Sequence, residues 1–259
     1  MPKTPPHAQG DSGKGDNRRQ ARERARVEAA KQQRKGRIRQ AIVVAVVGVL
    51  AIGIVVTAVL LGRAGRAERV PTASTNITVG GTSVPFNVDG SAVQVGRSDA
   101  KVTMDLWVDY SCPHCQEFEA DSSDVITQKV AAGTLKVRYH NIQIVTAYGT
   151  QAGSAGACVA TYAPDQWWAF NTALYANHSS ETDGWKGPEL ADFATQQGIT
   201  NSDAQSCIRD QRYTSWITDN TSAAGQAGVT GTPTLFFNGE KADTVSGTAL
   251  GTKIDELAK

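Results

Sequence analysis

The sequence predicts an α/β domain, in which helices cover a mixed sheet, preceded by a single transmembrane helix. Three observations support this prediction. An uncharged apolar segment occupies residues 41–61. Strand-like segments then flank a helix-like segment between residues 101 and 145. A helix-rich stretch, about residues 149–226, separates them from a last strand pair and a last helix, which predicts a helical domain inserted into the sheet fold.

The apolar segment, residues 41–61, contains 21 residues without a charged or amide side chain. As a helix rising ~1.5 Å per residue, it would cross the ~30 Å hydrocarbon core of a bilayer. The alternative is a buried core helix, but such a helix usually keeps a polar face. Because a 40-residue tail precedes the segment and no clean A-x-A cleavage pattern follows it, we expect an uncleaved transmembrane signal-anchor.

The tail, residues 1–40, contains twelve Lys or Arg residues and four acidic residues. It nearly lacks aromatic side chains, so we expect a disordered basic tail, and we favour this over the alternative of a nucleic-acid-binding segment. Positive charge marks the cytoplasmic side of a membrane span. We therefore expect a single-pass protein of the cell (inner) membrane with a cytoplasmic tail. Residues 62–75, a linker, and residues 76–259, one domain, would be extracytoplasmic.

The elements of this domain follow from local patterns. Residues 76–95 hold β-branched segments divided by Gly-Gly and Asp-Gly turns, which predicts an early hairpin or pair of short strands. Residues 101–110 and 135–145 are longer strand candidates, and a strand pair joined at Asn238-Gly239 is expected near the end. The expected helices cover residues 112–133, several segments within about 149–226, and residues 248–259.

Four cysteines, Cys112, Cys115, Cys158 and Cys207, all follow the predicted span, on the side of a membrane where disulfides can persist. A zinc site would need a second short-spaced pair, but Cys158 and Cys207 are 49 positions apart, so we expect no metal. A purely structural Cys112–Cys115 bridge would constrain little chain. These considerations favour a redox-active pair.

The chemistry of this pair follows from its place at the expected start of a helix, which Ser111 can cap. The helix N-terminus favours the thiolate of Cys112, and His114 can add an imidazole N–H or a positive charge near the same sulfur. Pro113 presets φ for the first helical turn. Stabilising the thiolate stabilises the reduced form, so the Cys112–Cys115 disulfide becomes more oxidising.

The CPHC motif, together with Thr232-Pro233 in the segment GVTGTPTLFFNG, resembles the DsbA-like thiol:disulfide oxidoreductases of the thioredoxin-fold family, in particular the actinobacterial membrane-anchored type. The resemblance covers roughly residues 90–259. It implies a thioredoxin-like fold with a helical insertion, and a redox site without a cofactor. Cys112 would be the exposed nucleophile and Cys115 its more buried partner. Thr232 would precede a cis-proline, Pro233, in a loop that faces the cysteines and pairs with an extended substrate.

One position departs from the family pattern. Many relatives have a Glu six residues before the first cysteine, where it can assist proton movement, and here that residue is Leu106. Asp105 should face the other side of its strand. Asp109 fits the family pattern but is expected near the surface. The proton acceptor for Cys115 therefore stays open at this point.

Several other residues have plainer interpretations. Cys158 and Cys207 are expected to form a structural disulfide between two helices of the insertion, and the rival readings are a second redox pair or two free thiols. His140 and His178 are expected to have no special task. The aromatic cluster that includes Trp167 and Tyr175 is expected in the domain core, although a ligand groove is an alternative.

Together these features predict an extracytoplasmic thiol:disulfide oxidoreductase that donates the Cys112–Cys115 disulfide to reduced exported proteins during oxidative folding. By resemblance, a quinone-linked membrane oxidase of the DsbB or vitamin K epoxide reductase (VKOR) type would reoxidise it. We expect a monomer without a nucleic-acid partner. The alternatives are a thiol reductase or isomerase, as in cytochrome c maturation, and a non-enzymatic membrane-anchored binding module with the same fold.

Overall fold

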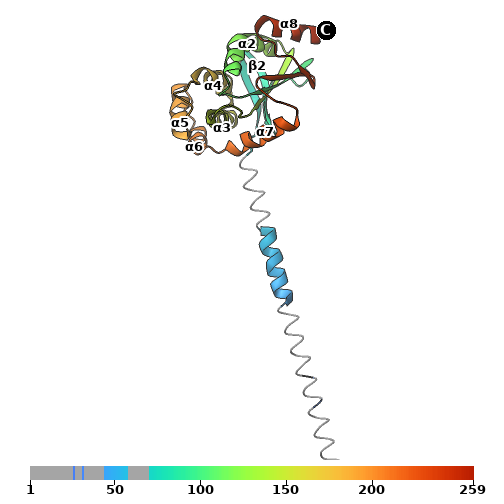
Figure 1. Cartoon of the computed structure of the whole chain (residues 1–259), viewed down its shortest axis with the longest axis vertical. Helices are drawn as coiled ribbons and strands as arrows, with labels where there is room; N and C mark the ends of the chain where they lie inside the picture. Colours follow the sequence, from blue (N-terminus) through green and yellow to red (C-terminus); the bar gives the residue numbers. More distant parts are fainter. Residues whose placement is uncertain (1–25, 27–30, 32–43, 58–69) are drawn as a thin grey trace, which may run out of the picture. The chain divides into compact units, whose positions relative to one another are not determined.

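This computed structural model describes Arg26, Lys31, residues 44–57 and residues 70–259 (Figure 1). The chain divides into two compact units, Met1–Ala64 and Gly65–Lys259. In the first unit, residues 44–57 form a helix whose side chains are exposed. No helix within the described ranges is both long enough and apolar enough to span a membrane. The remainder of the predicted span, nearly all of the basic tail and most of the predicted linker lie outside the described residues.

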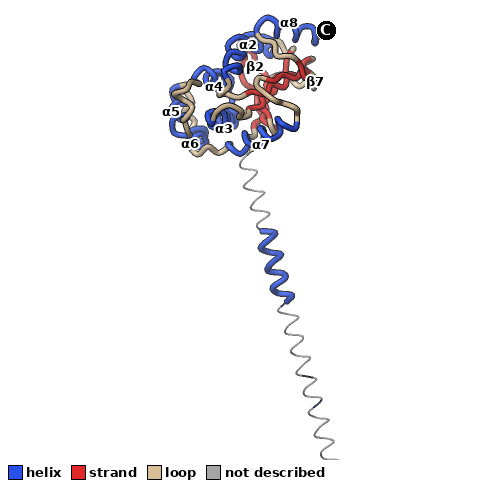
Figure 2. The backbone as a smooth tube through the Cα atoms, viewed as in Figure 1, coloured by secondary structure: helices blue, strands red, loops and turns tan. Residues whose placement is uncertain are grey.

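A seven-stranded mixed sheet forms the centre of the second unit, with the strand order β1-β2-β3-β5-β4-β6-β7 (Figure 2). The two central strands, β4 and β5, run parallel, and all other neighbours are antiparallel. The strands are β1 (Ala73–Val79), β2 (Thr82–Asp89), β3 (Ala92–Val95), β4 (Val102–Val108), β5 (Leu135–Asn141), β6 (Thr234–Phe237) and β7 (Glu240–Ala242).

The first strand begins earlier than the sequence predicts. β1 starts at Ala73, which lies inside the predicted linker of residues 62–75. The backbone pairing with β2 extends from Val79↔Thr82 back to Ala73↔Val88, and the buried side chains of Ile77 and Val79 fix the strand against the core. The linker therefore ends before Ala73, because strand pairing continues beyond the apolar residues that mark the strand in the sequence.

Seven helices accompany the sheet in residues 70–259. They are α2 (Pro113–Ala131), α3 (Ala147–Tyr162), α4 (Pro164–Asn177), α5 (Gly187–Gln196), α6 (Ser202–Arg209), α7 (Thr214–Gln226) and α8 (Gly247–Leu257). In Figure 1, α2 and α8 lie together at one end of the sheet, while α3, α4, α5 and α6 gather at its side. The insertion α3–α7 separates β5 from β6, which confirms the predicted α/β fold with a helical insertion.

The last part of the predicted helical stretch, residues 202–226, is divided in the structure into α6 and α7. The break falls at Gln211, whose φ is 49°, in the left-handed region that ends a right-handed helix. A hydrogen bond from the backbone N–H of Arg212 to the carbonyl of Cys207 (3.2 Å) closes the turn. The chain thereby reverses between the two helices.

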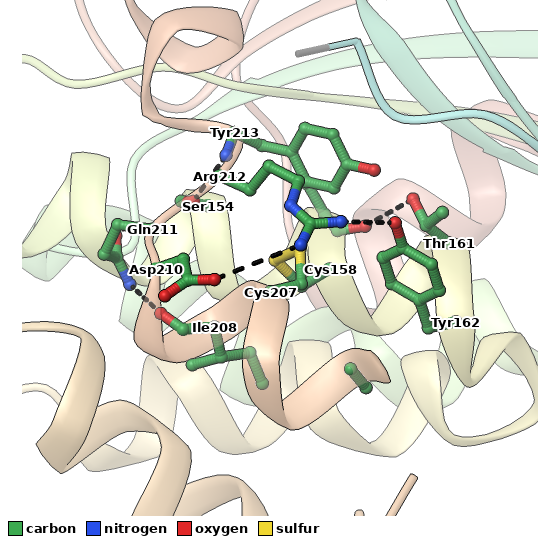
Figure 3. Close-up of a disulfide and its surroundings, with 12 residues drawn as sticks. Ser154, Cys158, Thr161, Tyr162, Cys207, Ile208, Asp210, Gln211, Arg212 and Tyr213 are labelled. Carbon is green, nitrogen blue, oxygen red and sulfur yellow. Dashed lines mark hydrogen bonds and ion pairs between the residues drawn. A yellow bond between two sulfur atoms is a disulfide. The ribbon is translucent and has the colours of Figure 1, made fainter. Parts of the chain in front are cut away.

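A disulfide joins Cys158 on α3 to Cys207 on α6, with a Cα–Cα distance of 5.7 Å and both residues fully buried. Figure 3 shows this bond beside Arg212, whose guanidinium donates a hydrogen bond to the hydroxyl of Tyr162 (2.9 Å) and lies 5.9 Å from the centre of its ring. The link fixes α6 against α3. This matters for the site below, because α3 begins beside it.

Candidate active site

The CPHC motif lies at the point where β4 gives way to α2. Because the parallel strands β4 and β5 are connected through α2, this helix begins at the carboxyl end of the central strand. Cys112 is the N-cap residue, with extended backbone angles (φ −88°, ψ 120°), and Pro113 occupies the first helical turn. The backbone N–H groups of Cys115 and Gln116 both donate to the carbonyl of Cys112, at 3.0 and 3.1 Å. The cysteine sulfur therefore sits at the positive end of a 19-residue helix.

Ser111 does not cap α2, so that expectation is wrong. Its hydroxyl donates to Asp109 Oδ1 (2.6 Å) and accepts the backbone N–H of Thr146 (3.1 Å). The reason is that the chain turns one residue later than expected and leaves Cys112 in the capping position.

Cys112 has a low pKa. Its pKa falls from an ordinary 9.0 to about 5, chiefly because the thiol of Cys115 donates a hydrogen bond to the Cys112 thiolate. The Thr232 side chain and the backbone N–H groups of Cys115 and His114 lower it further, against the opposing effect of burial. In the thiol form, Cys112 Sγ instead donates to the carbonyl oxygen of Thr232, at 3.3 Å.

Cys115 behaves in the opposite way. It is 1% exposed, and burial together with the neighbouring Cys112 raises its pKa far above that of an ordinary thiol. Both thiols are free in this structure. The pair thus combines one sulfur that is stable as an anion with one that is stable only when protonated.

The imidazole of His114 pairs with Glu117, and no hydrogen bond from it to the sulfur of Cys112 is found among the described residues. It is 79% exposed, and its Nδ1 lies 3.2 Å from Glu117 Oε2 on the next turn of α2. At the start of a helix, a side chain two residues after the N-cap points outward while its backbone N–H points back toward the cap. His114 therefore acts on Cys112 through its backbone N–H rather than its imidazole.

The loop before β6 completes the site. The peptide bond Thr232-Pro233 is cis, and Thr232 reaches Cys112 across 120 residues of sequence. A groove of ≈ 370 Å³ opens beside Thr232 and Pro233. Its lining consists of His114, Glu117, Phe118, Asp121, Thr232, Pro233, Thr244 and Ser246.

Asp109 is fully buried, so the expectation of a surface position is wrong. Its Oδ1 accepts the backbone N–H and hydroxyl of Ser111, at 2.8 and 2.6 Å. Its Oδ2 accepts the backbone N–H groups of Ile144 (2.7 Å) and Val145 (2.9 Å). The two hydrogen bonds from Ile144 and Val145 hold the turn that follows β5 beside the active-site strand. They leave the apolar side chains of Ile144 and Val145 about half exposed.

Close packing at the start of α3 supports the same arrangement. A Cβ atom at Gly149 would collide with the carboxylate of Asp109 and crowd the hydroxyl of Ser111. Only glycine lets the first turn of α3 approach the carboxylate this closely.

Glu119 is a buried acid that sequence reasoning missed. It lies on α2 four residues after Cys115, hence on the same face of the helix. Burial raises its pKa, and Thr172 Oγ1 donates a hydrogen bond to its Oε1 (2.7 Å). The helical spacing from Cys115 is the signal that could have identified it. Leu106, in contrast, is an apolar core residue.

Asp105 of β4 is engaged by β5 rather than by the cysteines. It is paired with Arg138 (2.7 Å) and His140 (2.8 Å) of β5, and these hydrogen bonds occupy it. Within the described ranges, no group of three or more His, Cys, Asp or Glu residues is placed to hold a metal ion.

Comparisons with known proteins agree with this geometry. The family model described as "Thioredoxin" matches residues 88–256. A protein of Rickettsia bellii named as a protein-disulfide oxidoreductase is 23% identical over 176 residues, which cover 67% of each chain. Disulfide bond formation protein D of Bacillus subtilis is 24% identical over 149 residues, which cover 56% of this chain but 66% of that protein.

Solved structures share the fold. DsbA of Mycobacterium tuberculosis in its oxidised form superimposes with a TM-score of 0.56 at 24% identity, over 64% of this chain and 92% of that one. MdbA of Corynebacterium diphtheriae, a thiol-disulfide oxidoreductase, superimposes with a TM-score of 0.59 at 20% identity, over 69% and 95% of the two chains. These matches confirm the predicted thioredoxin-like fold with its helical insertion.

Proposed function

Because the chain belongs to the thioredoxin family, we propose that it is a DsbA-like thiol:disulfide oxidoreductase whose Cys112–Cys115 disulfide is donated to reduced exported proteins. The observation that supports this direction is the opposite ionisation of the two thiols. Cys112 is stable as a thiolate, with a pKa of about 5, whereas burial keeps Cys115 protonated. A stabilised thiolate favours the reduced pair, so the disulfide form is a strong oxidant.

The transfer takes two steps. A substrate thiolate attacks Cys112 Sγ and forms a mixed disulfide, while the Cys112–Cys115 bond breaks and its electron pair goes to Cys115 Sγ. A second substrate thiolate then attacks the substrate sulfur of the mixed disulfide and releases Cys112 as a thiolate. The substrate loses two electrons and gains a disulfide, and the cysteine pair gains those two electrons. In this second step Cys112 is a better leaving group than an ordinary cysteine, because a thiol of low pKa leaves more readily.

The departing Cys115 sulfur needs a proton, because a buried thiolate is unstable. Glu119 can supply it. Its carboxyl lies one turn along the same face of α2, and burial, which disfavours the charged form, raises its pKa. Glu119 thereby takes the task left open by Leu106.

An extended and unfolded polypeptide fits the surroundings of Cys112. The groove beside Thr232-Pro233 can hold a chain segment, and the exposed apolar pair Ile144 and Val145 can contact side chains that a folded substrate would bury. When Cys112 is oxidised and no longer donates to the Thr232 carbonyl, backbone groups of this loop can pair with an extended substrate in the manner of an added strand.

An extracytoplasmic location is part of this proposal. The apolar segment at residues 41–61, with the basic tail before it, supports an inner-membrane anchor that places the domain outside the cytoplasm. A fully buried disulfide at Cys158–Cys207 suits the same oxidising compartment. A quinone-linked membrane oxidase of the DsbB or VKOR type would return the pair to its disulfide form.

A direct test uses the oxidised full chain in detergent and a reduced, unfolded protein that carries two cysteines. The wild type should form the substrate disulfide stoichiometrically, and Cys112→Ser should not. Cys115→Ala should not form it either, because neither variant can hold the Cys112–Cys115 disulfide that accepts the two electrons. If the purified wild type fails to oxidise the substrate, or if the reaction runs in reverse at equilibrium, the proposal is wrong and the reductase alternative gains support.

A further inference from the structure

The groove beside Thr232 and Pro233 follows one face of α2. The helix contributes four lining residues, which are His114, Glu117, Phe118 and Asp121. Their spacing of i, i+3, i+4 and i+7 places them on a single face of a helix. This face starts beside the N-cap residue Cys112, whose Sγ lies 3.3 Å from the carbonyl oxygen of Thr232. The groove therefore leads from the reactive sulfur along α2.

Two exposed carboxylates, those of Glu117 and Asp121, line this groove. In the part of the chain that the structure describes, no lysine or arginine lines it, and neither carboxylate has one within ion-pair distance. Glu117 Oε2 lies 3.2 Å from Nδ1 of the exposed His114, and Asp121 Oδ2 accepts the hydroxyl of Ser246 (3.4 Å). The first lysine of α2, Lys129, lies in the last turn of the helix. The two carboxylates thus leave negative charge in the groove without a lysine or arginine to offset it.

The spacing of the two carboxylates matches the repeat of an extended chain. Glu117 and Asp121 follow Cys112 by five and nine residues, or ~7.5 and ~13.5 Å along a helix that rises ~1.5 Å per residue. An extended chain advances ~3.3 Å per residue, so a substrate that leaves Cys112 along the groove passes the two carboxylates after about two and about four residues. Alternate residues of an extended chain project to the same side. Side chains at both positions therefore face α2 when the substrate cysteine faces Cys112.

We infer that Glu117 and Asp121 select reduced substrates that carry lysine or arginine at the second and fourth positions from the reacting cysteine. This inference rests on the proposed function, because the groove receives such a chain only when a substrate thiolate attacks Cys112. The cationic side chains pair with the two carboxylates and offset their repulsion of the incoming thiolate. Glu117 and Asp121 take no part in the bond changes, so they determine specificity and are not catalytic residues.

The test compares three synthetic peptides, each with one cysteine and blocked ends, against the oxidised full chain in detergent. The first has lysine at the second and fourth positions on both sides of the cysteine. The second has its lysines at the first and third positions, which keeps the charge but turns it to the other side of an extended chain. The third has glutamate at the second and fourth positions.

Loss of the Cys112–Cys115 disulfide, followed by rapid acid quench and mass spectrometry, reports the first attack. Each rate is divided by the rate of the same peptide with hydroxyethyl disulfide, a small neutral compound, which removes differences in thiol ionisation among the peptides. Exposed ion pairs are individually weak, so the first peptide should react about tenfold faster than the third and about threefold faster than the second. Because salt screens exposed charges, these ratios should fall to about twofold or less in about 0.5 M sodium chloride.

The double variant Glu117→Gln/Asp121→Asn should lower the ratio of the first to the third peptide to about twofold. The matched control, Asp219→Asn/Glu256→Gln, removes the same charge from exposed positions of α7 and α8 outside the groove and should keep the wild-type ratio. Equal normalised rates for the three peptides, a ratio that survives in Glu117→Gln/Asp121→Asn, or an equal loss in the control overturns the inference. The peptide and salt comparisons use the wild type alone and decide the matter even if a variant does not fold. If the wild type reacts with none of the peptides, the proposed function itself is refuted.

Discussion

Alkylation of Cys112 should follow the ionisation of a thiol with a pKa of about 5. With this value, about 99% of Cys112 is thiolate at pH 7, against a few per cent for an ordinary cysteine. Only the thiolate reacts with iodoacetamide. The rate of Cys112 modification in the reduced full chain, followed by peptide mass spectrometry, should therefore reach half its plateau near pH 5.

The substitution Cys115→Ala tests the cause of this low pKa. The thiol of Cys115 is the largest contribution, and a hydrogen bond to a charged group is worth about 1.5–3 kcal/mol, or roughly 1–2 pH units. The midpoint should therefore rise by about that amount. It should stay below that of a free cysteine, because Thr232 and the backbone N–H groups remain. Cys115→Ser, which keeps a donor at the same place, should retain most of the low value.

Two results would refute this reasoning. One is a wild-type midpoint at about pH 8.5, which is that of an unperturbed thiol. The other is an equal midpoint in the wild type and in Cys115→Ala, which would leave Thr232 and the backbone N–H groups as the causes of the low pKa. Cys158 and Cys207 provide an internal control, since their disulfide should keep them unmodified at every pH.

The remaining predictions concern stability and are checked by urea unfolding of the reduced or oxidised full chain. Glu119→Gln should stabilise the protein at pH 8 but not at pH 4. Burial raises the folded-state pKa of Glu119, so the wild type loses stability as the pH rises through that pKa, whereas glutamine does not ionise. An equal effect of the substitution at both pH values would contradict this reasoning. Gly149→Ala should lower the free energy of unfolding by about 1–3 kcal/mol, since its Cβ would collide with a buried carboxylate. Gly225→Ala, at a helical site with open space around it, should be neutral or slightly stabilising, and equal losses in both variants would argue against the collision. Replacing both Cys158 and Cys207 by alanine should cost about 4 kcal/mol, given their sequence separation of 49, and a loss below about 1 kcal/mol would show that the bridge constrains the unfolded chain little.

The elements of the fold follow from local sequence signals. From Val102 to Leu106, β4 alternates buried and partly buried residues as its sequence predicts, and α2 starts and stops within two residues of its predicted ends. The turn at Asn238-Gly239 joins β6 to β7 through two residues of positive φ, as such a pair predicts. The break between α6 and α7 gave no such signal. Gln211 has positive φ there without being a glycine or asparagine, and that conformation depends on the packing around it.

The site was predictable only where its chemistry is local. The helix N-terminus identifies Cys112 as the ionised sulfur from the sequence alone. Asp109 and Glu119 were not predictable in the same way, because acidic residues are rarely buried and their burial here depends on partners far along the chain. Asp109 is satisfied by the turn after β5, and Glu119 by Thr172 of the insertion.

The two sulfurs depend on different parts of the chain. Cys112 takes its low pKa from α2 and from Thr232, which belong to the thioredoxin-like core. Cys115 is enclosed partly by the helical insertion, whose α4 packs on α2 and carries Tyr175. Since the ionisation of Cys112 sets the equilibrium and the departure of Cys115 sets the rate of the first transfer step, substitutions in the Thr232 loop should mainly shift the redox equilibrium. If the proposed function is correct, substitutions in α4 should mainly change how fast the disulfide is given away.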